Sequence, residues 1–136
     1  MPYTAEQMYE LVNDIESYPA FLPWCSDASV TVHGDDSLTA SLSMAAGRIR
    51  HSFTTENTMQ PGRRIDVRLV NGPFRYLSGY WTFEPEEGGA CRITLEMDFE
   101  FKNKLLKMTL SKLFHHIMDS LVDAFTRRAR QVYGDA

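Results

Sequence analysis

The sequence has little of what marks several large classes of protein. Its 136 residues include only two cysteines, Cys25 and Cys91, with no CxxC pair, so neither a disulfide framework nor a zinc cluster is expected. It has no run of about 18 apolar residues, and its N-terminus lacks the basic start and apolar stretch of a signal peptide. We therefore expect a cytoplasmic protein with reduced thiols.

Motifs that carry catalysis or bind metals and nucleotides are also missing. His115 and His116 are adjacent, and on a helix they would point about 100° apart, unlike the i and i+4 pair that shares a metal ion. No histidine has a carboxylate or cysteine at a spacing that suggests a catalytic pair. A Gly-rich phosphate loop and DNA-binding motifs are absent as well. The sequence thus predicts a protein that is not an enzyme, with no catalytic or metal-binding residues, no required cofactor and no DNA partner.

The net charge is −4, but the positive charges are concentrated at one end of the chain. Residues 1–101 hold 7 Lys and Arg against 15 Asp and Glu, a balance of −8, whereas residues 102–136 hold 7 against 3, a balance of +4. A basic end of this kind is typical of a face that meets anionic lipid or RNA, and a solvated helix face gives the same pattern. The residues expected to contact a membrane or a ribosome are Lys104, Lys107, Arg127, Arg128 and Arg130.

The hydrophobic pattern predicts helices at both ends of the chain and strands between them. Thr4 and Gln7 form a capping-box pattern, which predicts a first helix over residues 5 to 15. Two prolines limit residues 17 to 22 to a short second helix. From residue 28 to 101 apolar and polar residues alternate, and six strands joined by short turns are expected. Residues 104 to 133 carry an apolar stripe at helical spacing and predict a helix of roughly 45 Å.

These elements predict an α+β fold. Short connections favour an antiparallel meander, and a curved sheet with one apolar face needs a cover, which the long helix can provide. The expected fold is a helix grip. A curved antiparallel sheet of about six strands would wrap around the long C-terminal helix, with two short helices near the N-terminus and one domain over residues 1–136.

Large and flexible apolar side chains are expected on the inner face of this sheet. Packing alone is the ordinary explanation of such a set. The alternative is an apolar pocket for a lipid-like ligand, with the aromatic segment at residues 13 to 25 as its lid, because a surface turn does not normally hold so many aromatic side chains. Strand parity points Tyr76 and Tyr80 away from this face, so few polar groups are expected inside.

Four stretches of the sequence resemble one family. They are AEQMYELVNDIESYPAFLPWC, GPFRYLSGYWTFEP, CRITLEMDFEFKNKLLKM and LVDAFTRRARQVYG, with YPAFLPWC and DFEFKNKL among the most specific segments. Together they cover nearly the whole chain. The chain is similar to the coenzyme Q-binding, RatA-type (ribosome association toxin) proteins of the START-like superfamily, which also contains polyketide cyclases and lipid transport proteins.

The resemblance implies a START-like helix-grip fold with a tunnel between the long helix and the sheet. It implies non-enzymatic binding of ubiquinone or another polyprenyl quinone in support of respiration. The alternative is a RatA-type toxin that binds the large ribosomal subunit and blocks its joining with the small one. A quinone carrier would also make transient contact with the anionic surface of the inner membrane. The tunnel and gate residues implied are Tyr18, Phe21, Leu22, Trp24, Phe53, Leu69, Phe74, Leu77, Trp81, Phe83, Met97, Phe99, Leu110, Phe114 and Met118.

One feature departs from the family pattern. Its members usually begin with a strand before the first helix, whereas only Met1, Pro2 and Tyr3 precede Thr4 here. We expect either a late start or a sheet that lacks this edge strand. A neighbouring strand left uncovered would favour dimerisation or aggregation.

Overall fold

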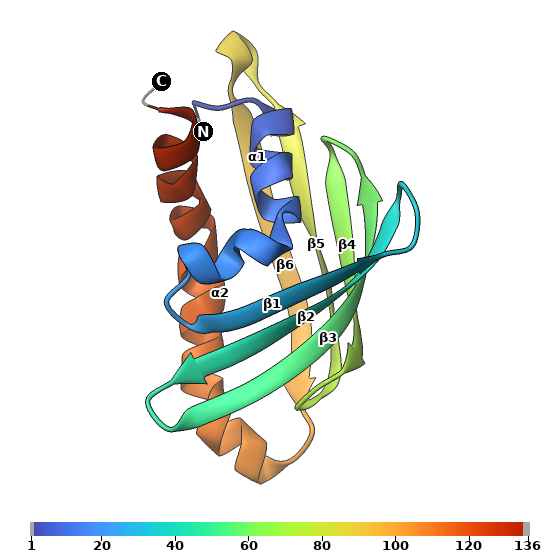
Figure 1. Ribbon diagram of the computed structural model, residues 1–136, viewed down its shortest axis with the longest axis vertical. Coiled ribbons are helices and arrows are strands. Elements are labelled where there is room, and N and C mark those ends of the chain that lie inside the picture. The colour runs from blue at the N-terminus through green and yellow to red at the C-terminus, as the bar shows by residue number, and fades with distance from the viewer. Residues whose placement is uncertain (1, 135–136) are drawn as a thin grey trace.

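The computed structural model describes residues 2–134. Figure 1 shows a curved sheet around a long helix, with two short helices packed beside the C-terminal half of that helix. The predicted α+β architecture is confirmed. In chain order the elements are α1 (Ala5–Asn13), the 3-10 helix η1 (Ile15–Ala20), β1 (Cys25–Val32), β2 (Ser37–Ala46), β3 (Ile49–Gln60), β4 (Arg64–Asn71), β5 (Phe74–Pro85), the 3-10 helix η2 (Glu87–Gly89), β6 (Cys91–Phe101) and α2 (Lys104–Tyr133).

The six strands form the predicted antiparallel meander, in the order β1-β2-β3-β4-β5-β6. Within residues 2–134, β6 pairs only with β5. Gly79 on β5 lies very close to β6, and an added Cβ there would be 2.1 Å from the carbonyl oxygen of Glu96. A side chain at this position would push the two strands apart, so glycine permits their close approach.

The long helix α2 begins and packs as its sequence predicts. The Asn103 side chain caps it by accepting a hydrogen bond of 2.9 Å from the Leu106 amide. Residues three or four apart lie on one face of a helix, and this spacing puts a single buried stripe against the sheet. The stripe consists of Leu110, Phe114, Ile117, Leu121, Phe125 and Ala129.

The N-terminal elements differ from the prediction at their ends. The capping box is confirmed, because Thr4 and Gln7 exchange hydrogen bonds of 2.9 and 3.1 Å. However, α1 ends at Asn13 because Asp14 leaves the helical conformation, and the chain continues as a 3-10 helix that stops at Ala20. The first strand begins at Cys25, three residues before the alternating region that the pattern predicted.

The core divides into two clusters along α2. The first joins α1, η1 and the C-terminal half of α2, and Phe125 at its centre is 0% exposed. The second lies near the N-terminal half of α2, where Phe74 contacts Phe114 with ring centroids 4.9 Å apart. Residues of both clusters line the candidate site.

Candidate functional site

A small cavity lies between the sheet and α2. Its volume is about 80 Å³. Pockets that hold drug-sized ligands measure roughly 300 to 1,000 Å³, so a larger molecule would have to displace side chains to enter. The lining is almost entirely apolar and consists of Ile15, Tyr18, Trp24, Ala40, Leu42, Met44, Phe53, Thr55, Asn57, Val67, Leu77, Trp81, Met97, Phe114, Ile117, Met118 and Leu121.

The fifteen tunnel and gate residues that the resemblance implies are divided between this cavity and its surroundings. Phe21 and Leu22 line an outer groove, and Phe99 lines a second groove beside the N-terminal end of α2. Leu69, Phe74, Phe83 and Leu110 pack in the two core clusters and reach neither cavity nor groove. The eight that line the cavity are Tyr18, Trp24, Phe53, Leu77, Trp81, Met97, Phe114 and Met118.

The cavity holds two polar side chains, which fits the expectation of few polar groups inside. Thr55 and Asn57 on β3 are only 5% and 6% exposed, and the Thr55 hydroxyl donates a hydrogen bond of 2.9 Å to Asn57 Oδ1. The signal for them was present in the sequence. Phe53 and Met59 lie on the inner face of β3, and a period of two puts the residues between them on that face too.

The segment predicted as a lid is anchored to α2 by aromatic contacts. Tyr18 and Phe21 both meet Phe125 edge to face, with ring centroids 5.3 and 5.4 Å apart. The Tyr18 hydroxyl donates to the Val12 carbonyl, and burial raises the pKa of Tyr18 well above its usual range. Burial also raises the pKa of the Cys25 thiol to about 11, which leaves an unreactive thiol at neutral pH.

The outer groove is next to the cavity and shares two lining residues with it. It has a volume of about 620 Å³ and is bordered by residues 21–24, the end of β2 and the outer side of α2. Trp24 and Leu121 line both the groove and the cavity. These two side chains therefore separate the interior from the surface, and their movement would join the two spaces.

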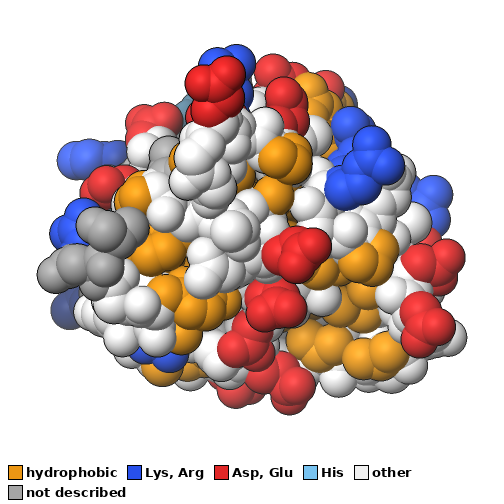
Figure 2. All heavy atoms as spheres, turned by 90° about the horizontal axis from the view of Figure 1, so that it is seen from above, with side chains coloured by type: hydrophobic (Ala, Val, Ile, Leu, Met, Phe, Trp, Pro, Cys, Tyr) orange, Lys and Arg blue, Asp and Glu red, His pale blue; other side chains and the backbone are white. Residues whose placement is uncertain are grey.

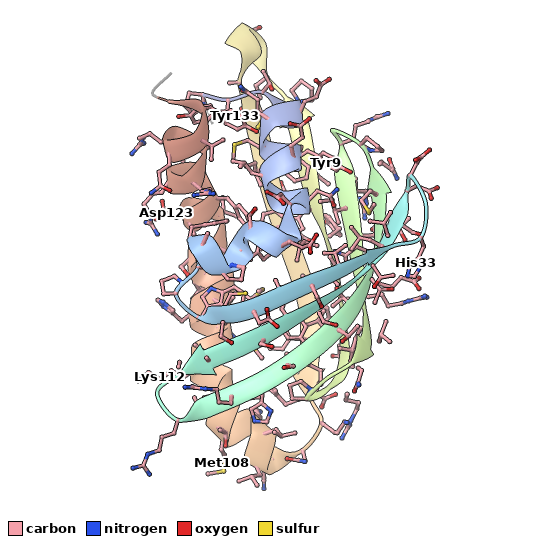
Figure 3. The ribbon with its side chains drawn as sticks, in the orientation of Figure 1. Tyr9, His33, Met108, Lys112, Asp123 and Tyr133 are labelled. Carbon is pink, nitrogen blue, oxygen red and sulfur yellow. The ribbon has the colours of Figure 1, made fainter. Side chains whose placement is uncertain are left out.

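The N-terminal end of α2 forms a basic tip, defined by Lys102, Lys104, Lys107 and Lys112 together with Leu105 and Met108. All four lysines are exposed, and no Asp or Glu occurs over residues 102–118. Leu105 and Met108 are 71% and 78% exposed, more than any other large apolar residue noted on the described surface. Figure 3 shows Met108 at the lower end of the molecule and Lys112 a turn above it.

The arginines at the other end of α2 have different surroundings. Arg127 forms an ion pair of 2.5 Å with Asp123, and the Arg128 guanidinium lies 5.0 Å from the centre of the Phe21 ring. Figure 2 views the molecule from this end and shows cationic and acidic side chains interspersed. About 30 Å of helix separates Lys107 from Arg127. The five residues predicted to contact a membrane or ribosome therefore form two groups and not one surface.

The described part of the chain shows no metal centre. Over residues 2–134 no three His, Cys, Asp or Glu side chains come together in a way that could hold a metal ion. None of the helices in that range is long and apolar enough to cross a membrane. The features that remain for function are the cavity with its outer groove and the basic tip.

Comparison with known proteins identifies similar chains. Ribosome association toxin RatA of Vibrio cholerae is 42% identical over 133 residues, which cover 98% of this chain and 92% of that protein. Coenzyme Q-binding protein COQ10 homolog B, mitochondrial, of Xenopus laevis is 27% identical, with coverage of 97% of this chain and 56% of that protein. These relatives confirm the resemblance found in the sequence.

Solved structures confirm the START-like fold. The Zhui aromatase/cyclase from Streptomyces sp. R1128 matches with a TM-score of 0.84 at 16% identity, covering 96% of this chain and 90% of that one. A START superfamily protein from Mycobacterium smegmatis matches with a TM-score of 0.80 at 18% identity, covering 97% and 93%. The family described as polyketide cyclase / dehydrase and lipid transport matches residues 1–126. The chain therefore belongs to this family.

Proposed function

We propose that this protein associates with the ribosome, through its large subunit. The observation that carries the proposal is the identity of 42% to proteins named ribosome association toxin, which extends over 98% of the chain. The match extends over almost the whole chain and is not confined to one part of the fold. It therefore supports a shared partner more strongly than the fold does, because one fold serves many functions.

The basic tip is the surface that we propose for this contact. Ribosomal RNA presents phosphate groups, and lysine side chains that neutralise them release bound counterions. On a chain of net charge −4, long-range attraction to RNA is weak unless the cations are concentrated. The tip provides this concentration, because none of its four lysines makes an ion pair with another described residue.

Sedimentation through a sucrose gradient tests this function. The purified protein is mixed separately with large subunits, small subunits and naked vesicles of phosphatidylglycerol and phosphatidylcholine. We expect it to migrate with large subunits at low salt and to be released as the salt concentration rises. Protein that stays at the top of the large-subunit gradient under all conditions would overturn the proposal. Preferential binding to the vesicles would instead favour the membrane contact predicted from the basic residues.

A second candidate function is binding of an apolar ligand, favoured by the cavity and the groove behind Trp24. Met44, Met97 and Met118 line the cavity, and flexible methionines can move to enlarge it. Because one relative is named a coenzyme Q-binding protein, we propose that this ligand is ubiquinone or another polyprenyl quinone. Mass spectrometry of an organic extract of detergent-free protein tests it. A polyprenyl quinone in the extract is expected, and an extract without lipid from membrane-rich lysates would contradict it.

Both candidate functions are non-enzymatic, and we propose that the protein catalyses no reaction. The relatives bear the names of a toxin and a binding protein, whereas the aromatase/cyclase neighbour shares only 16% identity and shows the fold alone. We propose a cytoplasmic location, where ribosomes are found. A ligand carrier would additionally visit the inner membrane surface, with Leu105 and Met108 of the tip as the apolar side chains nearest to lipid.

A further inference from the structure

The polar pair inside the apolar cavity points to the chemistry of a ligand, and this inference rests on the second candidate function. Thr55 and Asn57 lie two residues apart on β3, and both line the cavity. Opposite them on β2 are Ala40 and Leu38, which are also buried. The pair is therefore surrounded by apolar residues on the inner face of the sheet.

The hydrogen bonds of the pair are incomplete. The Thr55 hydroxyl donates its one hydrogen bond to Asn57 Oδ1, at 2.9 Å. No other described residue makes a hydrogen bond with the Asn57 side chain, so its amide nitrogen keeps two unused donors. The remaining hydroxyl in the lining, that of Tyr18, already donates to the Val12 carbonyl. Asn57 is only 6% exposed, and its free amide donors lie at the cavity that it lines.

Packing does not explain an asparagine at this position. An amide with unused donors is less favourable at a largely buried position than an apolar side chain, and leucine has the same branched shape although it is larger. Its neighbours on the same face, Phe53 and Met59, show that β3 otherwise follows the apolar pattern. Residues that weaken the fold at a cavity commonly serve binding.

The lining limits the class of ligand. It contains no Lys, Arg, His, Asp or Glu, so a charged group would be buried without a partner. Two N–H donors require an acceptor oxygen. We propose that the Asn57 amide, held in place by Thr55, donates a hydrogen bond to the carbonyl oxygen of a neutral, mainly apolar ligand. The carbonyl group occupies the small cavity, and the apolar remainder extends past Trp24 and Leu121 into the outer groove.

Two probes of matched shape test this inference. One is 2-decyl-1,4-benzoquinone, which carries carbonyl oxygens, and the other is decylbenzene, which carries none. Isothermal titration gives their affinities for the full chain and for its variants. The parent protein should bind the quinone at least tenfold more tightly than decylbenzene. Asn57→Leu should lose this preference, keep its affinity for decylbenzene within about twofold, and melt about 3 °C higher than the parent.

Controls separate a binding role from a structural one. Thr58→Val changes the next residue of β3, which is exposed on the other face, and should alter neither affinity nor melting temperature. Thr55→Val should reduce the quinone preference by a smaller factor, since it removes only the group that orients Asn57. Equal binding of both probes by the parent, or a lower melting temperature of Asn57→Leu with an unchanged preference, would overturn this inference alone. Binding of neither probe would overturn it together with the ligand-binding function.

Discussion

The two ends of α2 are both basic, but their surroundings differ. At the C-terminal end, Phe125 and Ala129 are fully buried, and the Tyr133 hydroxyl donates a hydrogen bond of 3.1 Å to the carbonyl of Gln7 in α1. At the N-terminal end, Leu105 and Met108 are 71% and 78% exposed. One helix therefore provides both an attachment to the core and an exposed basic tip.

The helix dipole distinguishes the two ends in the same way. Cations stabilise the C-terminal end of a helix and destabilise its N-terminal end. Arg130 lies in the last turn of α2, whereas the helix begins at Lys104 and has no acidic residue in its first turn. Arg130 therefore stabilises α2, whereas Lys104 destabilises it. Folding therefore does not explain the lysines of the tip, and their position fits the proposed contact with ribosomal RNA.

The largest effect should come from the packed end. Phe125→Ala removes a ring that contacts Tyr18, Phe21 and Trp81, with centroids 5.3 to 5.5 Å away. We expect the free energy of unfolding to fall by about 4 kcal/mol, because the cavity left behind cannot close. Urea denaturation measures this loss. Leu105→Ala is the matched change at the tip and should alter stability by less than about 0.5 kcal/mol. Similar losses of stability in the two variants would contradict the claim that only the C-terminal end of α2 is packed into the core.

Alkaline pH should also act on the packed end. Burial raises the pKa of the Cys25 thiol from 9.0 to about 11 and that of Tyr18, which packs on Phe125. The folded protein thus holds these protons more tightly than the unfolded chain. The resulting stabilisation is complete below pH 9 and is lost as the pH rises through 11, by about 2 kcal/mol from the thiol alone at pH 11.

Urea unfolding of the parent and of Cys25→Ala between pH 8 and 11 measures this change. The variant should lose less stability than the parent over the range. Parallel curves for the two proteins would show that the thiol titrates alike in the folded and unfolded states.

The smallest expected effect separates stability from binding at the tip. Lys104→Glu replaces a cation at the start of α2 by an anion and should raise the free energy of unfolding by about 0.5 kcal/mol. The same change should weaken binding to large subunits. Chemical denaturation and gradient sedimentation of one preparation measure both quantities. A variant that is less stable, or that binds as well as the parent, would contradict the role assigned to the tip.

Much of the fold could be predicted from local patterns. Period-two alternation located the strands, and the stripe from Leu110 to Phe125 located the face of α2 that packs on the sheet. Thr55 and Asn57 could have been found from the same alternation, since they lie between Phe53 and Met59. They do not stand out because polar side chains interrupt the apolar alternation by which an inner face is recognised.

Other features depend on packing between distant segments. The cavity of about 80 Å³ results from side chains of five strands, two helices and Trp24 meeting in three dimensions, and no short stretch of the sequence contains that information. The rise of the helix predicts that the basic residues of α2 divide into two groups. It does not predict which side chains they contact. Arg128 lies over Phe21 only because the 13–25 segment folds back onto α2.

Sedimentation of two variants with large ribosomal subunits decides whether the tip makes the proposed contact. In one variant Lys102, Lys104, Lys107 and Lys112 are all changed to Gln, and in the other Arg127, Arg128 and Arg130 are. At low salt the lysine variant should bind at least tenfold more weakly than the parent, with a shallower dependence on salt, whereas the arginine variant should bind within about twofold of it. Equal losses in the two variants, or a loss confined to the arginine variant, would contradict the proposal.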